Sequence, residues 1–288
     1  MIEALDPEAY IRRFDEYEIY PWQVFVLNAV RRGERRISII GARQSGKSTI
    51  TAGIPAYTAK NEKALALIYA PSREQAEDDI AKVKDYINND DSYPVLQLDS
   101  LDHVKLPNGS YIKANTSTAK TKRGKSKPRI LIFDEAALID DALYKTVRPM
   151  LTKNPECILI ALSSPYGKRG WFYRAAQSDR WLRIVVKAPW DIQNGALVPA
   201  EPEAVFQARM KEQGIHGFYS PRHTDRAFMV DELEEQGERW FRQEYLCEFV
   251  ETEDAAFRAE YIEAARQDYT PLLDGRPEVD DYEPMEVR

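Results

Sequence analysis

The sequence is poor in cysteine and histidine and has no long apolar run. Its two cysteines, Cys157 and Cys247, match neither a disulfide framework nor a metal-binding pair, and its three histidines lack the spacing of metal ligands. The longest apolar run, residues 64–70, is far shorter than the ~20 residues of a membrane-spanning helix. The first residues lack the basic and apolar pattern of a signal peptide. These absences argue against a membrane partner and favour a reducing, cytosolic setting.

Acidic and basic residues are unevenly distributed along the chain. The 288 residues carry a net charge of −7. Residues 251–288 hold 12 acidic and 4 basic side chains, a balance of −8, so residues 1–250 are nearly neutral at +1. The acidic total therefore does not exclude a DNA partner for the larger part of the chain. The sharpest basic cluster consists of Lys120, Lys122, Arg123, Lys125, Lys127 and Arg129.

A glycine-containing stretch after a short apolar run carries the strongest signal. Residues 37–40 predict a buried strand, and the next residues fit the pattern Gly, four residues, Gly, Lys, Ser/Thr of a phosphate-binding loop. Glycines let several backbone N–H groups point at one anion, and the following helix N-terminus adds partial positive charge. We predict that Lys47 reaches the β- and γ-phosphates and that the Ser48 hydroxyl binds Mg²⁺. The predicted nucleotide-binding residues of this loop are Gly41, Ala42, Arg43, Gln44, Ser45, Gly46, Lys47, Ser48 and Thr49.

A second apolar run, residues 130–133, predicts a buried strand that ends in Asp134 and Glu135. Ligands bind at the C-terminal ends of the strands in open parallel sheets. We predict that Asp134 holds Mg²⁺, usually through water, and that Glu135 orients and deprotonates an attacking water. A carboxylate directly after the Mg²⁺ ligand favours hydrolysis and argues against a small-molecule kinase. The alternative is an ordinary acidic helix cap after a strand.

Aromatic and amide side chains lie about twenty residues before the phosphate loop, in the stretch Tyr20-Pro21-Trp22-Gln23. An aromatic ring can stack on adenine, and an amide can bond both its N6 and its N7 atoms. We therefore predict that Trp22 and Gln23 bind adenine. The alternative is a tryptophan in the core and a solvated glutamine.

Two arginines are candidates for neutralising charge in the transition state. Arg43 lies inside the phosphate loop and would act in its own subunit. Arg123 lies in the basic loop ahead of Asp134 and would reach the site of a neighbouring subunit. The alternative for each is a charge that faces phosphate, DNA or solvent, and the sequence leaves the choice open.

Two serines follow a third apolar run, residues 157–162. Short hydroxyls at this place, on Ser163 and Ser164, can contact the γ-phosphate or the region of Glu135 and report phosphate loss to the rest of the domain. The alternative is a simple turn that ends at Pro165.

Strands alternate with helices over residues 1–189, which predicts an α/β core with a mostly parallel sheet and helices on both faces. Local signals add a helix cap at Ser72 and a hairpin turn at Asn108-Gly109. Residues 190–250 are richer in Gly, Pro and aromatic residues, with helices expected at 200–213 and 233–249, and we interpret them as a small lid subdomain. Residues 251–288 predict an acidic linker, or a segment that needs a partner to order.

Taken together, these stretches resemble the ATPase domain of the large terminase subunit of tailed bacteriophages, over about residues 20–257. The phosphate loop (Walker A) and the carboxylate strand (Walker B) are shared with many ATPases. More specific are Arg123-Gly124 and the stretch Ser163-Ser164-Pro165-Tyr166-Gly167, in which Ser164 stands where many relatives carry threonine. Further resemblance lies in residues 147–151, 171–173 and 242–249.

The resemblance implies a RecA-like P-loop NTPase fold of the ASCE class with a small lid subdomain. It implies an ATP-hydrolysing, Mg²⁺-dependent motor that drives double-stranded DNA through the portal protein into the procapsid. Such motors work as rings, commonly pentamers, with the small terminase subunit, in the host cytoplasm and at the portal vertex. A nuclease domain normally follows the lid, so residues 251–288 would lead toward it. Asp280-Asp281 is not a nuclease site by itself, and no DNA cleavage is predicted for these residues.

Two other functions stay open. A helicase-like nucleic-acid translocase would need a second RecA-like domain, for which these residues leave no room. A switch that binds ATP without turnover is opposed by Asp134 and Glu135. The first candidates for contacts to the DNA backbone, which should weaken steeply with salt and ignore sequence, are Lys120, Lys122, Lys125, Lys127, Lys168 and Arg169.

Overall fold

The computed structural model describes residues 6–14, 18–91, 95–116 and 127–251. The described residues up to Val250 belong to one compact unit, and residues 251–288 form a second unit. Arg123, with Lys120, Lys122 and Lys125, lies outside the described residues, and so does nearly all of the predicted acidic linker.

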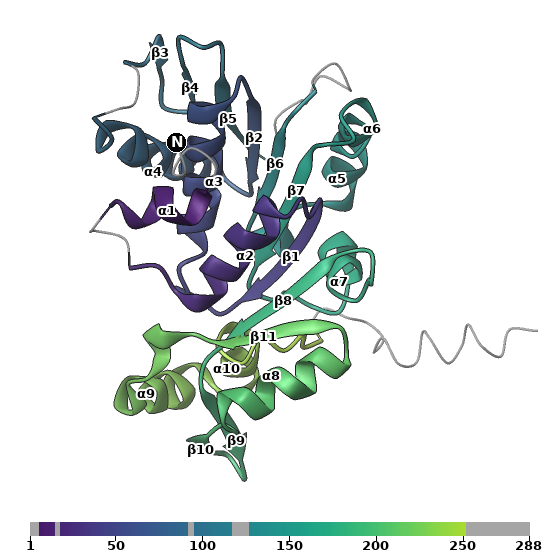
Figure 1. The fold of residues 1–288 in the computed structure, drawn as a ribbon. Coiled ribbons are helices and arrows are strands. Elements are labelled where there is room, and N and C mark those ends of the chain that lie inside the picture. Colours follow the sequence, from purple (N-terminus) through teal and green to yellow (C-terminus); the bar gives the residue numbers. More distant parts are fainter. Residues whose placement is uncertain (1–5, 15–17, 92–94, 117–126, 252–288) are drawn as a thin grey trace, which may run out of the picture. The chain divides into compact units, whose positions relative to one another are not determined.

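A nine-stranded sheet runs through the described part of the compact unit (Figure 1). All strand pairs from β11 to β5 are parallel, whereas β4 and β3 add an antiparallel edge. This confirms the predicted mostly parallel sheet. The spatial order of the strands is β11 (Ile215–Tyr219), β8 (Leu182–Lys187), β1 (Arg36–Gly41), β7 (Ile158–Ser163), β6 (Ile130–Asp134), β2 (Leu65–Ala70), β5 (Tyr111–Thr116), β4 (His103–Lys105) and β3 (Leu98–Asp99).

The two strands that lead into the predicted nucleotide site are separated by β7. Ile40 of β1 pairs with Ser163, and Leu162 pairs with Asp134 of β6. The sheet is parallel here, so the C-terminal ends of β1, β7 and β6 lie side by side. The phosphate loop, the serines after β7 and the two carboxylates therefore reach the same edge.

Each face of the sheet is covered by its own apolar cluster. Successive side chains of a strand point to opposite faces of the sheet. Ile37 and Ile39 of β1 belong to the cluster on one face, whereas Leu131 and Phe133 of β6 belong to the cluster on the other. The first face is covered by α1 (Pro7–Arg12), α2 (Pro21–Arg31), α3 (Lys47–Asn61) and α4 (Arg73–Asn88) (Figure 1). The second is covered by η2 (Ala136–Leu138), α5 (Asp141–Val147), α6 (Met150–Lys153), α7 (Gly170–Ala176) and α8 (Glu203–Glu212).

Several local predictions hold, and two fail. Ser72 caps α4, because its Oγ accepts a hydrogen bond of 3.1 Å from the N–H of Gln75. The hairpin turn at Asn108-Gly109 joins β4 to β5, with Gly109 at φ +85°. The expected helix 233–249 is wrong, since Gly237 at φ +83° ends α9 (Arg226–Gln236) and precedes α10 (Glu238–Glu244). The apolar pattern of residues 24–30 predicts a helix over those residues, but α2 begins earlier, with Pro21 at its first position.

Residues 190–250 have an apolar cluster of their own. They contain a hairpin of β9 (Trp190–Gln193) and β10 (Ala196–Pro199), the helices α8 to α10, and η3 (Pro221–His223). Trp190, Met229 and Phe241 belong to this cluster. Strand β11, however, pairs with β8 and so extends the main sheet. The boundary at residue 189 stays a prediction.

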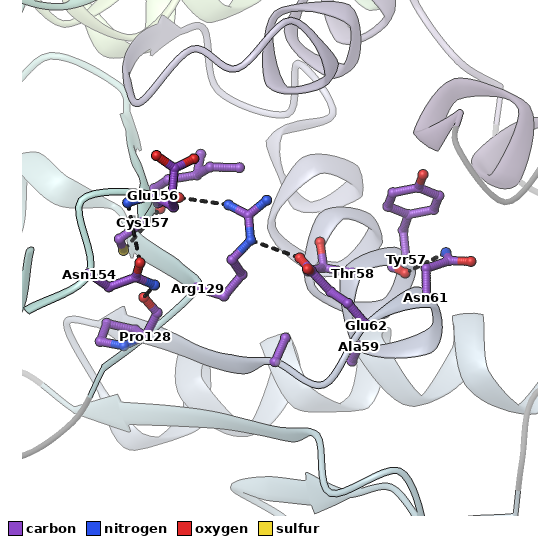
Figure 2. A network of polar contacts seen from close by, with 12 residues as sticks. Tyr57, Thr58, Ala59, Asn61, Glu62, Pro128, Arg129, Asn154, Glu156 and Cys157 are labelled. Atoms are coloured by element: carbon purple, nitrogen blue, oxygen red, sulfur yellow. Dashed lines mark hydrogen bonds and ion pairs between the residues drawn. The ribbon is translucent and has the colours of Figure 1, made fainter.

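One arginine ties together elements at the opposite edge of the sheet (Figure 2). Arg129 precedes β6, and its Nε donates a 2.7 Å hydrogen bond to Glu62, directly after α3. Its Nη1 donates a 2.7 Å bond to the backbone oxygen of Glu156, shortly before β7. Arg35, before β1, forms an ion pair with the carboxylate of Glu156. Arg129 was counted in the basic cluster, yet its side chain joins α3, β6 and β7.

Candidate functional site

The phosphate loop is a strand–loop–helix junction. β1 ends at Gly41, and α3 begins at Lys47. Gly46 has φ +89°, a conformation that a side chain strains. A Cβ on Gly46 would also lie 2.9 Å from Nε2 of Gln23 and 3.3 Å from Cε2 of Tyr20. Glycine at this position is therefore required both by the backbone angle and by the two side chains packed against it.

Gln23 supports the loop from outside. Its Nε2 donates a 2.8 Å hydrogen bond to the carbonyl oxygen of Gly46, and its Oε1 accepts a 2.7 Å bond from the N–H of Tyr20. Gln23 and Trp22 are both completely buried, and Trp22 belongs to the core cluster beneath α2. Both polar atoms of the Gln23 amide thus have backbone partners. The assignment of Trp22 and Gln23 to adenine stays a prediction.

Glu135 lies between the loop lysine and Ser163, the last residue of β7. Its Oε1 is 3.8 Å from Nζ of Lys47, and its Oε2 accepts a 3.0 Å hydrogen bond from Oγ of Ser163. Lys47 also donates to the carbonyl oxygens of Gly41 and Ala42, at 3.4 and 3.2 Å. The backbone of Glu135 is left-handed, at φ +44° and ψ +49°, an uncommon conformation for a non-glycine residue. The carboxylate is thus held by Lys47 on one oxygen and by Ser163 on the other.

Asp134 is buried and is oriented by α4. Its Oδ2 accepts a 2.9 Å hydrogen bond from Nε2 of Gln75. Burial raises the pKa of Asp134 above its ordinary value, and the charge of Glu135 raises it further. A positive charge beside the Asp134 carboxylate would stabilise its ionised form and so lower the pKa again. Asp134 and the nearby Ser48 hydroxyl offer oxygen atoms as ligands. Mg²⁺ prefers oxygen ligands.

A second buried carboxylate lies one helical turn after Gln75. Asp79 is completely inaccessible, and neither of its oxygens has a hydrogen-bond partner among the described residues. Burial raises its pKa strongly, with the charge of Asp134 as the next cause. Burial and the charge of Asp134 thus both favour the protonated form of Asp79.

Two cavities meet at Glu135. The first, of about 320 Å³, is bordered by Gln44, Ser45, Gly46, Lys47, Ser48, Gln75, Lys82, Asp134, Glu135 and Arg222. The second, of about 330 Å³, is bordered by Arg43, Glu135, Leu138, Ser163, Ser164, Pro165, Tyr166 and Glu244. The predicted loop, carboxylate and serine residues are thus brought together, with Glu135 shared by both cavities.

Arg43 lies on the side of the second cavity. Its N–H donates a 2.8 Å hydrogen bond to the carbonyl oxygen of Glu244, and its guanidinium carbon lies 5.9 Å from the centre of the Trp240 ring. Arg43 is exposed and belongs to the same chain as Glu135. Its competitor Arg123 lies outside the described residues, so the choice between the two arginines stays open.

Comparison with models of protein families shows the family to which this chain belongs. Residues 38–264 match the model described as terminase large subunit, T4likevirus-type, N-terminal. The chain belongs to this family. The resemblance seen in the sequence is therefore confirmed, and the terminase match covers the phosphate loop, Asp134, Glu135 and residues 190–250.

Solved terminase structures share the fold. The large terminase ATPase domain of Thermus phage P74-26 is 20% identical, with 82% of this chain and 95% of that chain covered at a TM-score of 0.56. The large terminase of thermophilic bacteriophage D6E is 8% identical, with coverages of 76% and 49% and a TM-score of 0.51. The HK97 bacteriophage large terminase is 18% identical, with coverages of 77% and 44% and a TM-score of 0.50. This terminase chain thus spans about half the length of the latter two.

One further comparison and two observations on the structure concern the terminase domain. No curated protein sequence matches the chain. No helix among the residues that the structure describes is long and apolar enough to cross a bilayer. Within the same residues, no three histidine, cysteine or acidic side chains converge as a metal cage.

Sequence reasoning missed several residues of this terminase site. Gln75, Asp79 and Lys82 lie on one face of α4, at spacings of four and three residues. Asp79 interrupts the apolar stripe that contains Ala76, Ile80 and Val83, and this interruption was the available signal. No sequence pattern pointed to Arg222, because a single arginine far along the chain does not show which residue it contacts.

Proposed function

We propose that this terminase domain hydrolyses Mg²⁺-ATP and that hydrolysis drives double-stranded DNA through the portal into the procapsid. The observation that carries the proposal is the position of Glu135, held between Lys47 and Ser163 at the mouth of the phosphate loop. A carboxylate here can accept the proton of an attacking water. Membership of the terminase family supplies the link to DNA packaging.

The phosphate loop binds the triphosphate. Backbone N–H groups of Gln44, Gly46, Lys47 and Ser48, at the N-terminus of α3, would face the anion, whereas those of Ala42 and Arg43 bond to the carbonyl oxygens of Val186 and Glu244. Lys47 would reach the β- and γ-phosphates. Ser48 and Asp134 would hold an Mg²⁺ ion, with Gln75 fixing the Asp134 carboxylate. Such an ion would neutralise charge on the phosphates. Trp22 and Gln23 remain our proposed adenine residues, although the contact requires the Gln23 amide to exchange a backbone partner.

Glu135 orients and deprotonates the water, while Ser163 and Ser164 report the loss of the γ-phosphate. The Ser163 bond to Oε2 of Glu135 is the direct route by which β7 would respond. Arg43 in the same subunit, or Arg123 from a neighbour, supplies positive charge to the transition state. The proposed assembly is a ring, with five subunits as the expected number, on the portal protein and with the small terminase subunit. It forms in the host cytoplasm.

DNA contacts are proposed for the basic side chains that the sequence singled out. Of these, Lys127, Lys168 and Arg169 are described and exposed. Lys168 and Arg169 directly precede α7, beside the serine loop, and neither forms an ion pair with another described residue. This location suits a contact that responds to the nucleotide.

The test is Mg²⁺-ATP hydrolysis per subunit against protein concentration, with Glu135→Gln as the blank. A specific rate that rises with concentration would mean that a neighbour completes the site, which favours Arg123. A constant rate would mean that the site is complete in one subunit, which favours Arg43. ATP binding without turnover, even with DNA and portal added, would overturn the proposal in favour of the switch.

A further inference from the structure

A lid residue borders the predicted nucleotide cavity. Arg222 belongs to η3, within residues 190–250, and lies on the 320 Å³ cavity together with the phosphate loop. Its Nε donates a 2.6 Å hydrogen bond to the hydroxyl of Tyr20. Its guanidinium carbon lies 5.5 Å from the centre of the Tyr20 ring. Residues 202 positions apart in the chain thus meet beside the loop.

Tyr20 fixes the place of this guanidinium. It is only 5% exposed, and its ring packs against Gly46. A side chain bonded to the Tyr20 hydroxyl is therefore held beside Gly46 of the phosphate loop.

The charge of Arg222 is not neutralised by the protein. Among the described residues no carboxylate forms an ion pair with it, and only its Nε has a hydrogen-bond acceptor. The side chain is exposed, and its two Nη groups remain available for bonding at the cavity. The planar fork of an arginine matches the oxygens of a phosphate group.

Arg222 is also joined to the lid interior. The next residue, His223, is buried, and its carbonyl oxygen accepts a 2.6 Å hydrogen bond from Nε1 of Trp190. Trp190 is a member of the lid cluster, and α9 begins at Arg226. A change in the position of Arg222 therefore has a short covalent and hydrogen-bonded route into the lid.

We propose that Arg222 binds the phosphate chain of the nucleotide in its own subunit and so couples nucleotide occupancy to the lid. The role rests on the proposed function, since it needs a nucleotide at the loop. It is separate from the roles of Arg43, which lies on the other cavity, and of Arg123.

The experiment is calorimetric titration with a non-hydrolysable ATP analogue and Mg²⁺. Arg222→Ala should raise Kd on the order of 10-fold, because a hydrogen-bonded charge partner is lost. Arg222→Lys should have a smaller effect, since it keeps the charge but loses the fork. Tyr20→Phe should weaken binding slightly and add nothing in the Arg222→Ala background. Arg226→Ala removes an exposed arginine that does not border the cavity, so it should bind as the wild type does.

A second readout follows the lid. Amide hydrogen exchange over residues 222–236 should slow when the analogue binds the wild type, and this slowing should be lost in Arg222→Ala. A variant with wild-type Kd and wild-type slowing would overturn the role of Arg222 while leaving the proposed function intact. Absence of binding by the wild type would instead overturn the proposed function. If Arg222→Ala does not fold, Arg222→Lys and Tyr20→Phe decide by the same two measurements.

Discussion

Nε2 of Gln23 lies 2.8 Å from the carbonyl oxygen of Gly46, so helix α2 supports the phosphate loop through one buried hydrogen bond. The same amide closes the start of α2 through its 2.7 Å bond with the N–H of Tyr20. A residue predicted from the sequence to touch the base of the nucleotide thus shapes the loop that faces its phosphates.

Gln23→Ala should weaken both the fold and the nucleotide site. It leaves the Gly46 carbonyl and the Tyr20 N–H without their partner in a buried place, which costs about 2 kcal/mol of unfolding free energy. Urea unfolding without nucleotide measures this loss, and titration with an ATP analogue should show a raised Kd. Gln236→Ala, at the exposed end of α9, is the matched control and should leave both values unchanged. Unaltered stability of Gln23→Ala would contradict the supporting role.

Ser163→Ala should slow ATP turnover more than it weakens ATP binding. The variant removes the 3.0 Å hydrogen bond to Oε2 of Glu135 but leaves the loop and Lys47 intact. We expect kcat to fall on the order of 10-fold with KM little changed, because a mispositioned base acts in the transition state. Steady-state kinetics of Ser163→Ala beside Ser164→Ala checks this. Equal effects of the two variants on kcat would argue against a special role of the Ser163 bond.

Asp79→Asn should stabilise the nucleotide-free domain at alkaline pH. Burial raises the pKa of Asp79, so the folded state holds its proton more tightly than the unfolded state does. The stability that this proton contributes is complete below the ordinary aspartate pKa of about 4 and is lost as pH rises through the raised value. An asparagine cannot ionise and escapes this loss. Urea unfolding of both proteins at pH 6 and at alkaline pH measures the difference, which should widen toward alkaline pH.

For His223 we expect the opposite pH dependence, a loss of stability toward acidic pH. Burial lowers its pKa to about 4, so the folded state keeps the ring neutral. Its contribution is complete above the ordinary histidine pKa of about 6.5 and falls away as pH drops toward 4, by roughly 3 kcal/mol at most. His223→Gln, which does not titrate, should lose less stability than the wild type between pH 7 and pH 5. Parallel unfolding curves for the two proteins across that range would contradict the prediction.

The parallel core could be predicted because its signals are local. β6 and β7 are continuous apolar runs that end in Asp134 and Ser163, and β1 is a short apolar run interrupted by Ser38. Such runs suit strands covered on both faces. The Gly-Lys-Ser pattern placed the loop between β1 and α3 for the same reason. The break at Gly237 was missed because an isolated glycine within a helical pattern does not by itself show that its φ is positive.

The remaining parts of the site depend on contacts between distant residues. The hydrogen bond from the Gln23 amide to Gly46 could not be predicted, because nothing in the local pattern indicates that Gly46 is its partner. Asp79 has no local partner, so only the packing of α4 onto the sheet shows how deeply it is buried. The meeting of Arg222 with Tyr20 follows from the path of the chain through η3, which no short motif encodes.

Arg129 joins α3 and β6 at the ends that lie far from the proposed catalytic site. Helix α3 starts at Lys47 and is held at its other end through Glu62, while β6 starts beside Arg129 and finishes at Asp134. α3 and β6 each run from this contact to the proposed site, so the Arg129–Glu62 pair contributes to the separation of Lys47 from Asp134. We therefore expect the alignment of the proposed site to depend in part on a side chain at the opposite end of these strands.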